Sequence, residues 1–190
     1  MNQQKNTQDF KDIVTMYIKR EGIDDLMAWL ENSDFFSAPA STRFHGSETG
    51  GLCKHSINVF QQLDRVASLF APDKYSREAL AIVALFHDLC KVDCYKPGFR
   101  NVKDDKTGQW SRVPTFNWEE QQCFGGHGSK SLFLVTQFMK LSFEEAAAIN
   151  SHMGFSDQSN INAVSSCYEQ NLLAWMLHVA DEAATYIDKV

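Results

Sequence analysis

Residues 80–91, LAIVALFHDLCK, join an uninterrupted apolar run to an adjacent histidine and aspartate. The apolar run predicts a buried helix that ends in His87 and Asp88, and burying these two polar groups without partners would cost several kcal/mol. A bound cation would remove that cost. Neighbours on a helix point about 100° apart, so the ion would lie across the helix surface between them. Lys91, one turn beyond His87, would then offer a point charge to a phosphate held there.

Histidines and aspartates on both sides of this pair form an ordered series along the chain. Each member lies on or beside a predicted helix, so we expect them to converge on one centre in a bundle. Imidazole and carboxylate donors suit a divalent ion of iron, manganese, zinc, nickel or cobalt. The site could hold one such ion or two. The series comprises His55 in GGLCKHS, His87 and Asp88 in LFHDLCK, His127 in GGHGSKS, His152 in NSHMG, and Asp181 in LHVADEA.

Apolar spacing of helical period dominates the chain and predicts an all-α bundle. Residues 33–49 and about 154–163 are expected to be irregular, and a long final helix is predicted from about Ser166 to Asp188. Ser76 is a candidate N-cap, and Ser142 with Glu145 forms a capping box. We expect residues 1–49 to form N-terminal helices packed on a main domain of residues 50–190. Two alternating runs around DDKTG predict an inserted β-hairpin at about 95–120.

Composition places the chain among ordinary globular proteins. It has 190 residues, 44% of them hydrophobic, and its 18 basic and 24 acidic side chains give a net charge of −6. It has no apolar stretch of the ~18–20 residues that a membrane span needs. MNQQKNTQDF lacks the layout of a secretory signal, and the five cysteines, which include Cys90 and Cys94, contain no C-x-x-C pair. We therefore expect reduced thiols, a cytoplasmic location and no membrane partner.

The predicted hairpin differs in charge from the rest of the chain. Residues 91–112 carry six basic and three acidic side chains, a net charge of +3. Such a segment is suited to an anionic substrate, and equally to a solvated hairpin whose lysines face water. The aromatic residues interleaved with these charges are suited either to stacking on a base or to packing the hairpin onto the helices. They are Tyr95, Phe99, Trp110, Phe116 and Trp118.

The series H…HD…D, with HDLCK at its centre, resembles the HD-domain superfamily of metal-dependent phosphohydrolases over about residues 50–188. The resemblance implies an HD-domain helical bundle in which His55, His87, Asp88 and Asp181 hold a metal. His127 and His152 are similar to the additional histidines of two-metal subgroups such as HD-GYP phosphodiesterases. This resemblance implies that Asp88 bridges two ions, and that His127 and His152 hold the second ion.

Two departures limit the resemblance. The GYP motif is absent, so cyclic di-GMP has no support as a substrate. The motifs GGLCKHS, GHG and SHMG are also similar to those of bacterial HD-type 3′–5′ exoribonucleases, but residues 1–49 read as helices and not as the nucleic-acid-binding barrel of those enzymes. His178 shares a helical face with Asp181, where packing is favoured over ligation. His45, in a polar stretch, is expected at the surface.

The resemblance implies a metal-dependent phosphohydrolase that cleaves a phosphomonoester or phosphodiester, most simply of a nucleotide or short oligonucleotide, with a metal-activated water. Asp88 and Lys91 are the expected catalytic residues, and Lys91, Arg100 and Lys130 are the expected contacts to the phosphate. The expected partner is a small phosphorylated molecule, with no stable nucleic-acid complex because the whole chain is acidic. The sequence leaves the oligomeric state open.

Two other functions stay open from the sequence. The same ligand set is similar to the di-iron arrangement of HD-fold oxygenases such as inositol oxygenase, which bind their substrate to iron and consume dioxygen. A non-catalytic nucleotide-binding regulator is the third possibility. It is less favoured, because a binding module would not need every member of the series.

Overall fold

The apolar run of residues 80–86 forms the middle of the molecule. In the computed structural model, which describes residues 2–42, 46–156 and 161–188, this run is the body of helix α4 (Arg77–Phe86). All of its side chains from Leu80 to Phe86 are buried, as expected for a helix that is apolar on every side. Ser76 is the N-cap, as predicted, and its hydroxyl accepts a hydrogen bond from Ala79 N. Three helices pack against α4, namely α1 (Asn2–Tyr17), α3 (Gly51–Phe70) and α6 (Phe143–Ser151).

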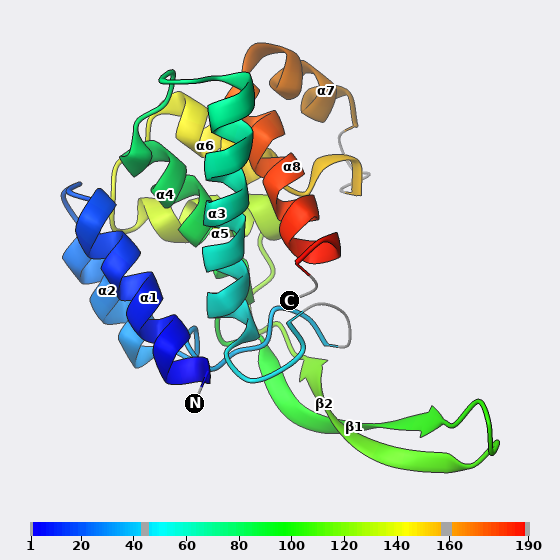
Figure 1. Cartoon of the computed structure of the whole chain (residues 1–190). Coiled ribbons are helices and arrows are strands. Elements are labelled where there is room, and N and C mark those ends of the chain that lie inside the picture. The colour runs from blue at the N-terminus through cyan, green and yellow to red at the C-terminus, as the bar shows by residue number, and fades with distance from the viewer. Residues whose placement is uncertain (1, 43–45, 157–160, 189–190) are drawn as a thin grey trace.

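The remaining helices complete a bundle around this centre (Figure 1). Helix α8 packs along α3 and α6, α5 packs on α6, and α7 packs on α8. None of the helices in the described ranges combines the length and apolar character needed to cross a membrane. The other elements are α2 (Ile23–Asn32), α5 (His127–Thr136), α7 (Ile161–Gln170), α8 (Leu172–Tyr186), and the short 3₁₀ helices η1 (Leu89–Lys91) and η2 (Gly154–Ser156).

The N-terminal helices join the bundle through aromatic rings and an ion-pair network. The ring centroid of Phe10 on α1 lies 6.1 Å from that of Phe86 on α4. Arg20, between α1 and α2, donates hydrogen bonds of 2.5 and 3.0 Å to the carboxylate of Glu145 and one of 3.1 Å to that of Glu78. One guanidinium therefore connects the N-terminal segment to both α4 and α6.

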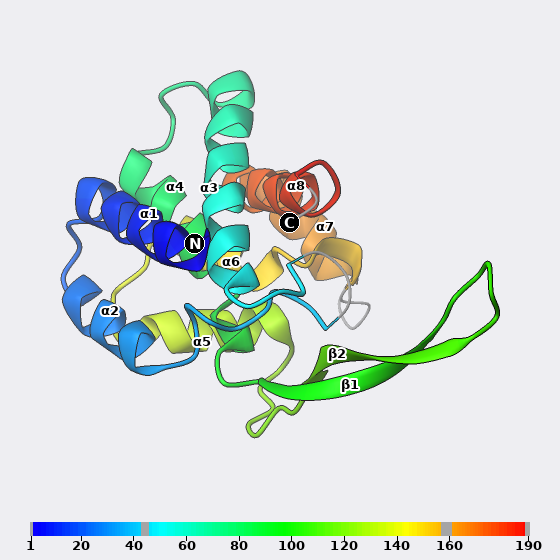
Figure 2. The ribbon, with the colours of Figure 1, turned by 60° about the horizontal axis from the view of Figure 1, so that its bottom comes forward.

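The predicted hairpin is present and is the only sheet in the described part of the chain. Its strands β1 (Tyr95–Lys103) and β2 (Trp110–Trp118) pair antiparallel without a bulge. Figures 1 and 2 show, from two directions, that the hairpin extends out from the bundle as an arm. The root of the arm is fixed by hydrogen bonds from the Tyr95 hydroxyl to Ala40 O, 3.1 Å, and from the Thr115 hydroxyl to Thr42 O, 2.7 Å.

Two expectations about the helices need correction. The predicted final helix is broken into α7 and α8 at Asn171, whose side-chain oxygen accepts hydrogen bonds from Leu173 N and Ala174 N and so caps a new helix. In addition, α4 ends at Phe86, so His87 is its C-cap and Asp88 follows in a turn. The pair is therefore not displayed on a helix surface, and Lys91 lies in η1. The capping box of Ser142 and Glu145 is confirmed.

Candidate metal centre

Five segments of the bundle bring the predicted series together. His55 comes from α3, the adjacent His87 and Asp88 from the end of α4, and Asp181 from α8. His127 is the first residue of α5, and His152 is the C-cap of α6. His55, His87, Asp88 and His152 are buried. The fold therefore brings the imidazoles and carboxylates of the ordered series to one centre, as the sequence predicted.

His87 and His152 are presented in the same way. Each is the C-cap of its helix, and its Nδ1 lies 2.8 Å from the carbonyl oxygen three residues earlier, Ala84 O and Ile149 O respectively. Because a carbonyl can only accept, Nδ1 carries the proton and Nε2 keeps the lone pair of a neutral ring. Both Nε2 atoms are buried and have no hydrogen-bond partner among the described residues. Each ring therefore points an unused acceptor into the cluster.

The Asp88 carboxylate lies between these histidines. Its Oδ2 is 3.4 Å from His87 Nε2 and 3.8 Å from His55 Nε2, and its Oδ1 is 3.6 Å from His152 Nε2. The two oxygens thus face different imidazoles. A carboxylate in this position is suited to contacting two ions at once, which is the role that the resemblance implies.

The second carboxylate, Asp181, completes one side of the cluster. Its Oδ1 lies 3.0 Å from His55 Nε2 and 3.9 Å from His87 Nε2. Its side chain retains 17% of its accessible surface, compared with 3% for Asp88. The cluster is therefore closed around Asp88 and open to solvent beside Asp181.

Lys91 supplies the positive charge of the cluster. Its Nζ lies 2.6 Å from Asp88 Oδ2, and its side chain is 12% exposed. Burial would lower the pKa of Lys91, but the Asp88 carboxylate outweighs burial and raises it, so Lys91 remains an ammonium at neutral pH. With neutral imidazoles, the two carboxylates and this ammonium leave the cluster with a net negative charge.

The charged neighbours also set the protonation of the other groups. Burial would raise the pKa of both carboxyls, but Lys91 and His87 hold that of Asp88 low, and His55 and His87 hold that of Asp181 low. Burial lowers the pKa of His55 and of His127, whereas for His87 the carboxylates of Asp88 and Asp181 outweigh burial and raise the pKa. Ionised carboxylates and neutral imidazoles are the forms that bind metals.

His127 lies at the margin of the cluster and is only partly buried. Its ring stacks on that of Trp118, with centroids 5.6 Å apart and planes 25° apart. Gly128 allows α5 to approach α6, because a Cβ there would lie 2.0 Å from Asn150 O. The sequence did not single out Trp118 as a neighbour of this histidine, since only the fold brings the end of β2 to the start of α5.

Candidate ligand atoms within 4.8 Å of one another fall into three groups among the described residues. One contains His55, His87 and Asp88, and another contains His87, His152 and Asp181. The third joins Asp88 and His127 to Cys90, which the sequence indicated as a buried thiol. His127 and His152 thus fall into different groups, whereas the resemblance pairs them at a second ion. Burial raises the pKa of Cys90 to about 12, so it is a neutral thiol here.

His178 supports the cluster from outside. Its Nδ1 lies 2.8 Å from His152 O, and its ring stacks on Tyr168 with centroids 5.7 Å apart. Gly154 accommodates the ring, since its φ is +57° and a Cβ there would lie 2.5 Å from His178 Cε1. These contacts agree with the packing role favoured for His178 from the sequence.

The two other predicted phosphate contacts are placed differently. Arg100 is exposed in the middle of β1, opposite Val113, in the arm and away from the cluster. Lys130 on α5 is engaged by Glu120, with 2.8 Å between Nζ and Oε1. His45 lies outside the described residues.

The residues present fit a bound metal ion. The buried Nε2 atoms of His87 and His152, and the Asp88 carboxylate between them, would each be stabilised by a divalent cation. The donor set matches first-row transition metals such as iron, manganese or zinc. The ligands would be His55, His87, Asp88 and Asp181, with His127 and His152 beside Asp88.

In comparisons with known proteins, no protein-family model, curated protein or solved structure matches this chain.

Proposed function

We propose that this protein is a metal-dependent phosphohydrolase of the HD-domain type, which cleaves a phosphomonoester or phosphodiester. The observation that carries the proposal is the Asp88 carboxylate, which is buried between imidazole nitrogens without hydrogen-bond partners and lies 2.6 Å from the ammonium of Lys91. A cation site directly beside a fixed positive charge is suited to an anionic substrate.

Metal binding would involve the ligands already brought together by the fold. When bound, the ion supplies a Lewis acid that polarises a phosphoryl oxygen and makes water acidic enough to be a nucleophile near neutral pH. Asp88 and Asp181 neutralise the ion's charge. His87 and His152 enter with fixed tautomers, because their Nδ1 atoms are held by backbone carbonyls.

Lys91 would stabilise the phosphate. Its ammonium lies beside Asp88 at the end of η1, so it places positive charge next to the ligands. Substrate would approach where the cluster is partly accessible, beside Asp181 or beside His127. Neither Arg100, in the arm, nor Lys130, paired with Glu120, is needed for this arrangement.

The test combines metal analysis with hydrolysis. Purified protein is expected to contain one or two transition-metal ions per chain and to hydrolyse a generic phosphodiester or phosphomonoester. The Asp88→Ala variant is expected to lose bound metal and activity together, because it removes the carboxylate between the imidazoles. Asp25→Ala, which alters an exposed aspartate on α2, is the matched control.

Two outcomes would contradict the proposal. One is full hydrolysis by Asp88→Ala at the metal content of the wild type. The other is oxygen uptake by the reduced, iron-loaded protein with no hydrolysis of any phosphate ester, which would favour the HD-fold oxygenase instead.

A further inference from the structure

The strand register places all the aromatic residues of the arm, residues 95–118, on one face of the ribbon. Directly opposed residues of an antiparallel pair lie on the same face, and every second residue returns to it. Tyr95 opposes Trp118, and Lys103 opposes Trp110. The face that contains these pairs also contains Phe99, Phe116, Pro97, Pro114, Asn101 and Arg112. We call it the aromatic face.

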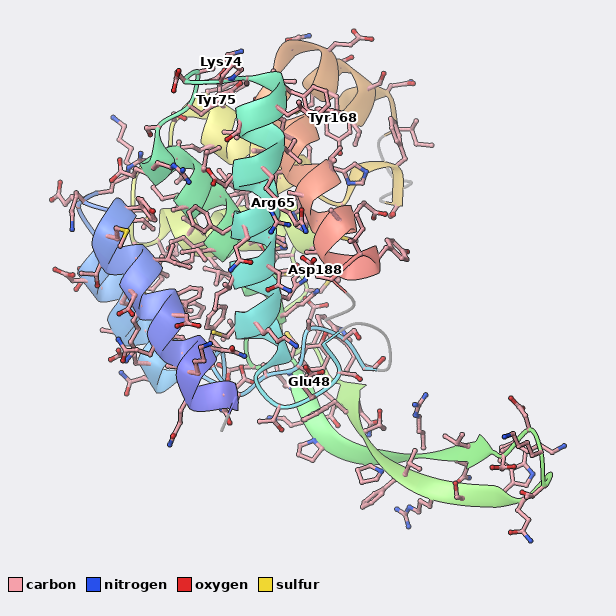
Figure 3. The ribbon with its side chains drawn as sticks, viewed as in Figure 1. Glu48, Arg65, Lys74, Tyr75, Tyr168 and Asp188 are labelled. Atoms are coloured by element: carbon pink, nitrogen blue, oxygen red, sulfur yellow. The ribbon has the colours of Figure 1, made fainter. Side chains whose placement is uncertain are left out.

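The outer half of this face is exposed to solvent. Phe99 and Trp110 retain 58% and 68% of their accessible surface. The Arg112 guanidinium lies 4.3 Å from the centroid of the Phe99 ring, which forms a cation–π pair on the surface. Figure 3 shows that side chains along the arm project into solvent, well away from the helices. These two rings are therefore accessible to a ligand.

The inner half of the same face leads to the candidate metal centre. The Trp118 ring lies 5.2 Å from the Tyr95 ring on one side and stacks on His127 on the other. A pocket of about 780 Å³ lies between the arm and residues 34–39 and 47–49, and Tyr95, Phe99 and Phe116 form part of its wall. A molecule lying along the aromatic face would therefore reach His127 at its inner end.

Part of the positive charge of the arm lies on this face, because Lys103 and Arg112 are on it, whereas Lys96 and Arg100 lie on the opposite face. The arm contains five basic and two acidic residues, a net charge of +3 in a chain of net −6. One of the acidic residues, Asp104, is engaged within the turn, where its carboxylate accepts hydrogen bonds from Lys106 N and Thr107 N. Asp34 and Glu48 also line the pocket, so phosphates are expected to contact Lys103 and Arg112 at the outer end of the face and not the pocket itself.

We infer that the arm binds a single strand of nucleic acid, DNA or RNA, along its aromatic face and directs one end to the candidate metal centre. Aromatic rings interleaved with cations are the elements of single-strand recognition, since every base has a face on which to stack. Eight residue steps separate Trp118 from Trp110, about 27 Å of strand. This length matches on the order of eight stacked nucleotides.

This inference rests on the proposed function, which gives the substrate as a phosphate ester. The inference narrows that substrate class to oligonucleotides. It also revises one expectation. The acidity of the whole chain argued against a stable nucleic-acid complex, but that average conceals a basic arm on an acidic body. Binding is expected to be of moderate strength and strongly salt-dependent.

The test measures binding by fluorescence anisotropy, using labelled single strands of about eight nucleotides, as DNA and as RNA, with the same sequence as a duplex. Chelator is present throughout, so that hydrolysis does not interfere. Trp110→Ala is expected to weaken single-strand binding roughly 5- to 150-fold. Arg112→Gln is expected to reduce the slope of log affinity against log salt by about 0.7. Both residues lie on the exposed arm, so their replacement leaves the bundle core untouched.

Matched controls lie elsewhere on the molecule. Phe143→Ala removes an aromatic ring that is 86% exposed on α6. Arg65→Gln removes an exposed cation on α3, a helix of the bundle and not of the arm (Figure 3). Both are expected to bind as the wild type does. The inference would be overturned by absence of single-strand binding, by equal losses in arm and control variants, by preference for the duplex, or by equal competition from polyglutamate.

The two proposals fail in distinguishable ways. If the arm binds single strands but the metal-loaded protein hydrolyses no phosphate ester, the inference stands and the proposed function fails. If the protein hydrolyses small phosphate esters but does not bind single strands, the proposed function stands and the inference about the arm fails.

Discussion

At the scale of single residues, the same device presents His87 and His152. Each ends a helix and turns its ring back so that Nδ1 meets a carbonyl of the preceding turn. The device fixes both the tautomer and the direction of Nε2 without any side-chain partner, which leaves the acceptor available for a cation. It also explains why the sequence could indicate these histidines. Each directly follows a helical stretch, where the carbonyls at the helix end lack intrahelical partners.

The sequence could not indicate which histidines share an ion. That grouping depends on distances of a few ångströms between residues far apart in the chain, such as Asp88 and His152 at 3.6 Å. It also could not place Cys90 or Trp118 at the centre, because thiols and tryptophans are common in cores and carry no spacing signal.

His178 is expected to act as a positioning residue for His152. Its Nδ1 contacts His152 O at 2.8 Å, so His178→Ala should release the segment that carries a metal ligand. We expect the affinity for a divalent ion to fall about tenfold, measured by competition with a chelator. Tyr186→Ala, which removes an exposed aromatic ring at the end of α8, is the control. Unchanged affinity in His178→Ala would contradict this role.

At the scale of elements, caps explain both the accurate and the inaccurate predictions. Ser76 and the Ser142–Glu145 box were recognisable because their cap residues precede apolar periodic segments. The break between α7 and α8 was not recognisable, because apolar periodicity continues across Asn171 and one asparagine is compatible with a helix interior. Tertiary contact decides the matter, since the Asn171 side-chain nitrogen also donates to Glu144 O at 2.9 Å.

Asn171→Ala is therefore expected to destabilise the fold more than an ordinary cap deletion. It removes the cap of α8 and a buried hydrogen bond to α6, which together contribute about 2 kcal/mol to the free energy of unfolding. Ser76→Ala removes only the hydrogen bond at the start of α4, and about 1 kcal/mol is expected. Urea denaturation of both variants measures the comparison. Equal losses would show that the Glu144 contact contributes nothing.

At the scale of the whole molecule, the acidic bundle and the basic arm are the two parts of a net charge of −6. The sequence predicted this division, because the basic residues are contiguous in the hairpin. It could not predict how the N-terminal helices attach, since Arg20, Glu78 and Glu145 are far apart in the chain. Their contacts exist only once α1, α4 and α6 have packed.

The Arg20 network is expected to make stability depend on pH through Glu78. Burial would raise the pKa of the Glu78 carboxyl, but hydrogen bonds from Lys19 N and Arg20 lower it below the ordinary value of 4.5. A lowered pKa in the folded state stabilises the fold above the unfolded pKa, and this contribution is lost as the pH falls through the folded value. Glu78→Gln should therefore be less stable than the wild type near neutral pH, by less than about 1 kcal/mol because the pair is partly exposed.

This difference should begin to shrink as the pH falls below about 4.5, where Glu78 of the unfolded chain takes up a proton, and should vanish once the folded carboxyl is protonated as well. Urea midpoints at about pH 7, 5, 4 and 3 measure it for both proteins. Glu169→Gln, at an exposed position on α7, controls for the removal of one negative charge from an acidic molecule. A Glu78→Gln deficit that stays constant down to the lowest pH would mean that the shape of the side chain, and not its charge, holds the N-terminal helices to α4. In that case Arg20 would depend on Glu145 alone for its ionic contact with the bundle.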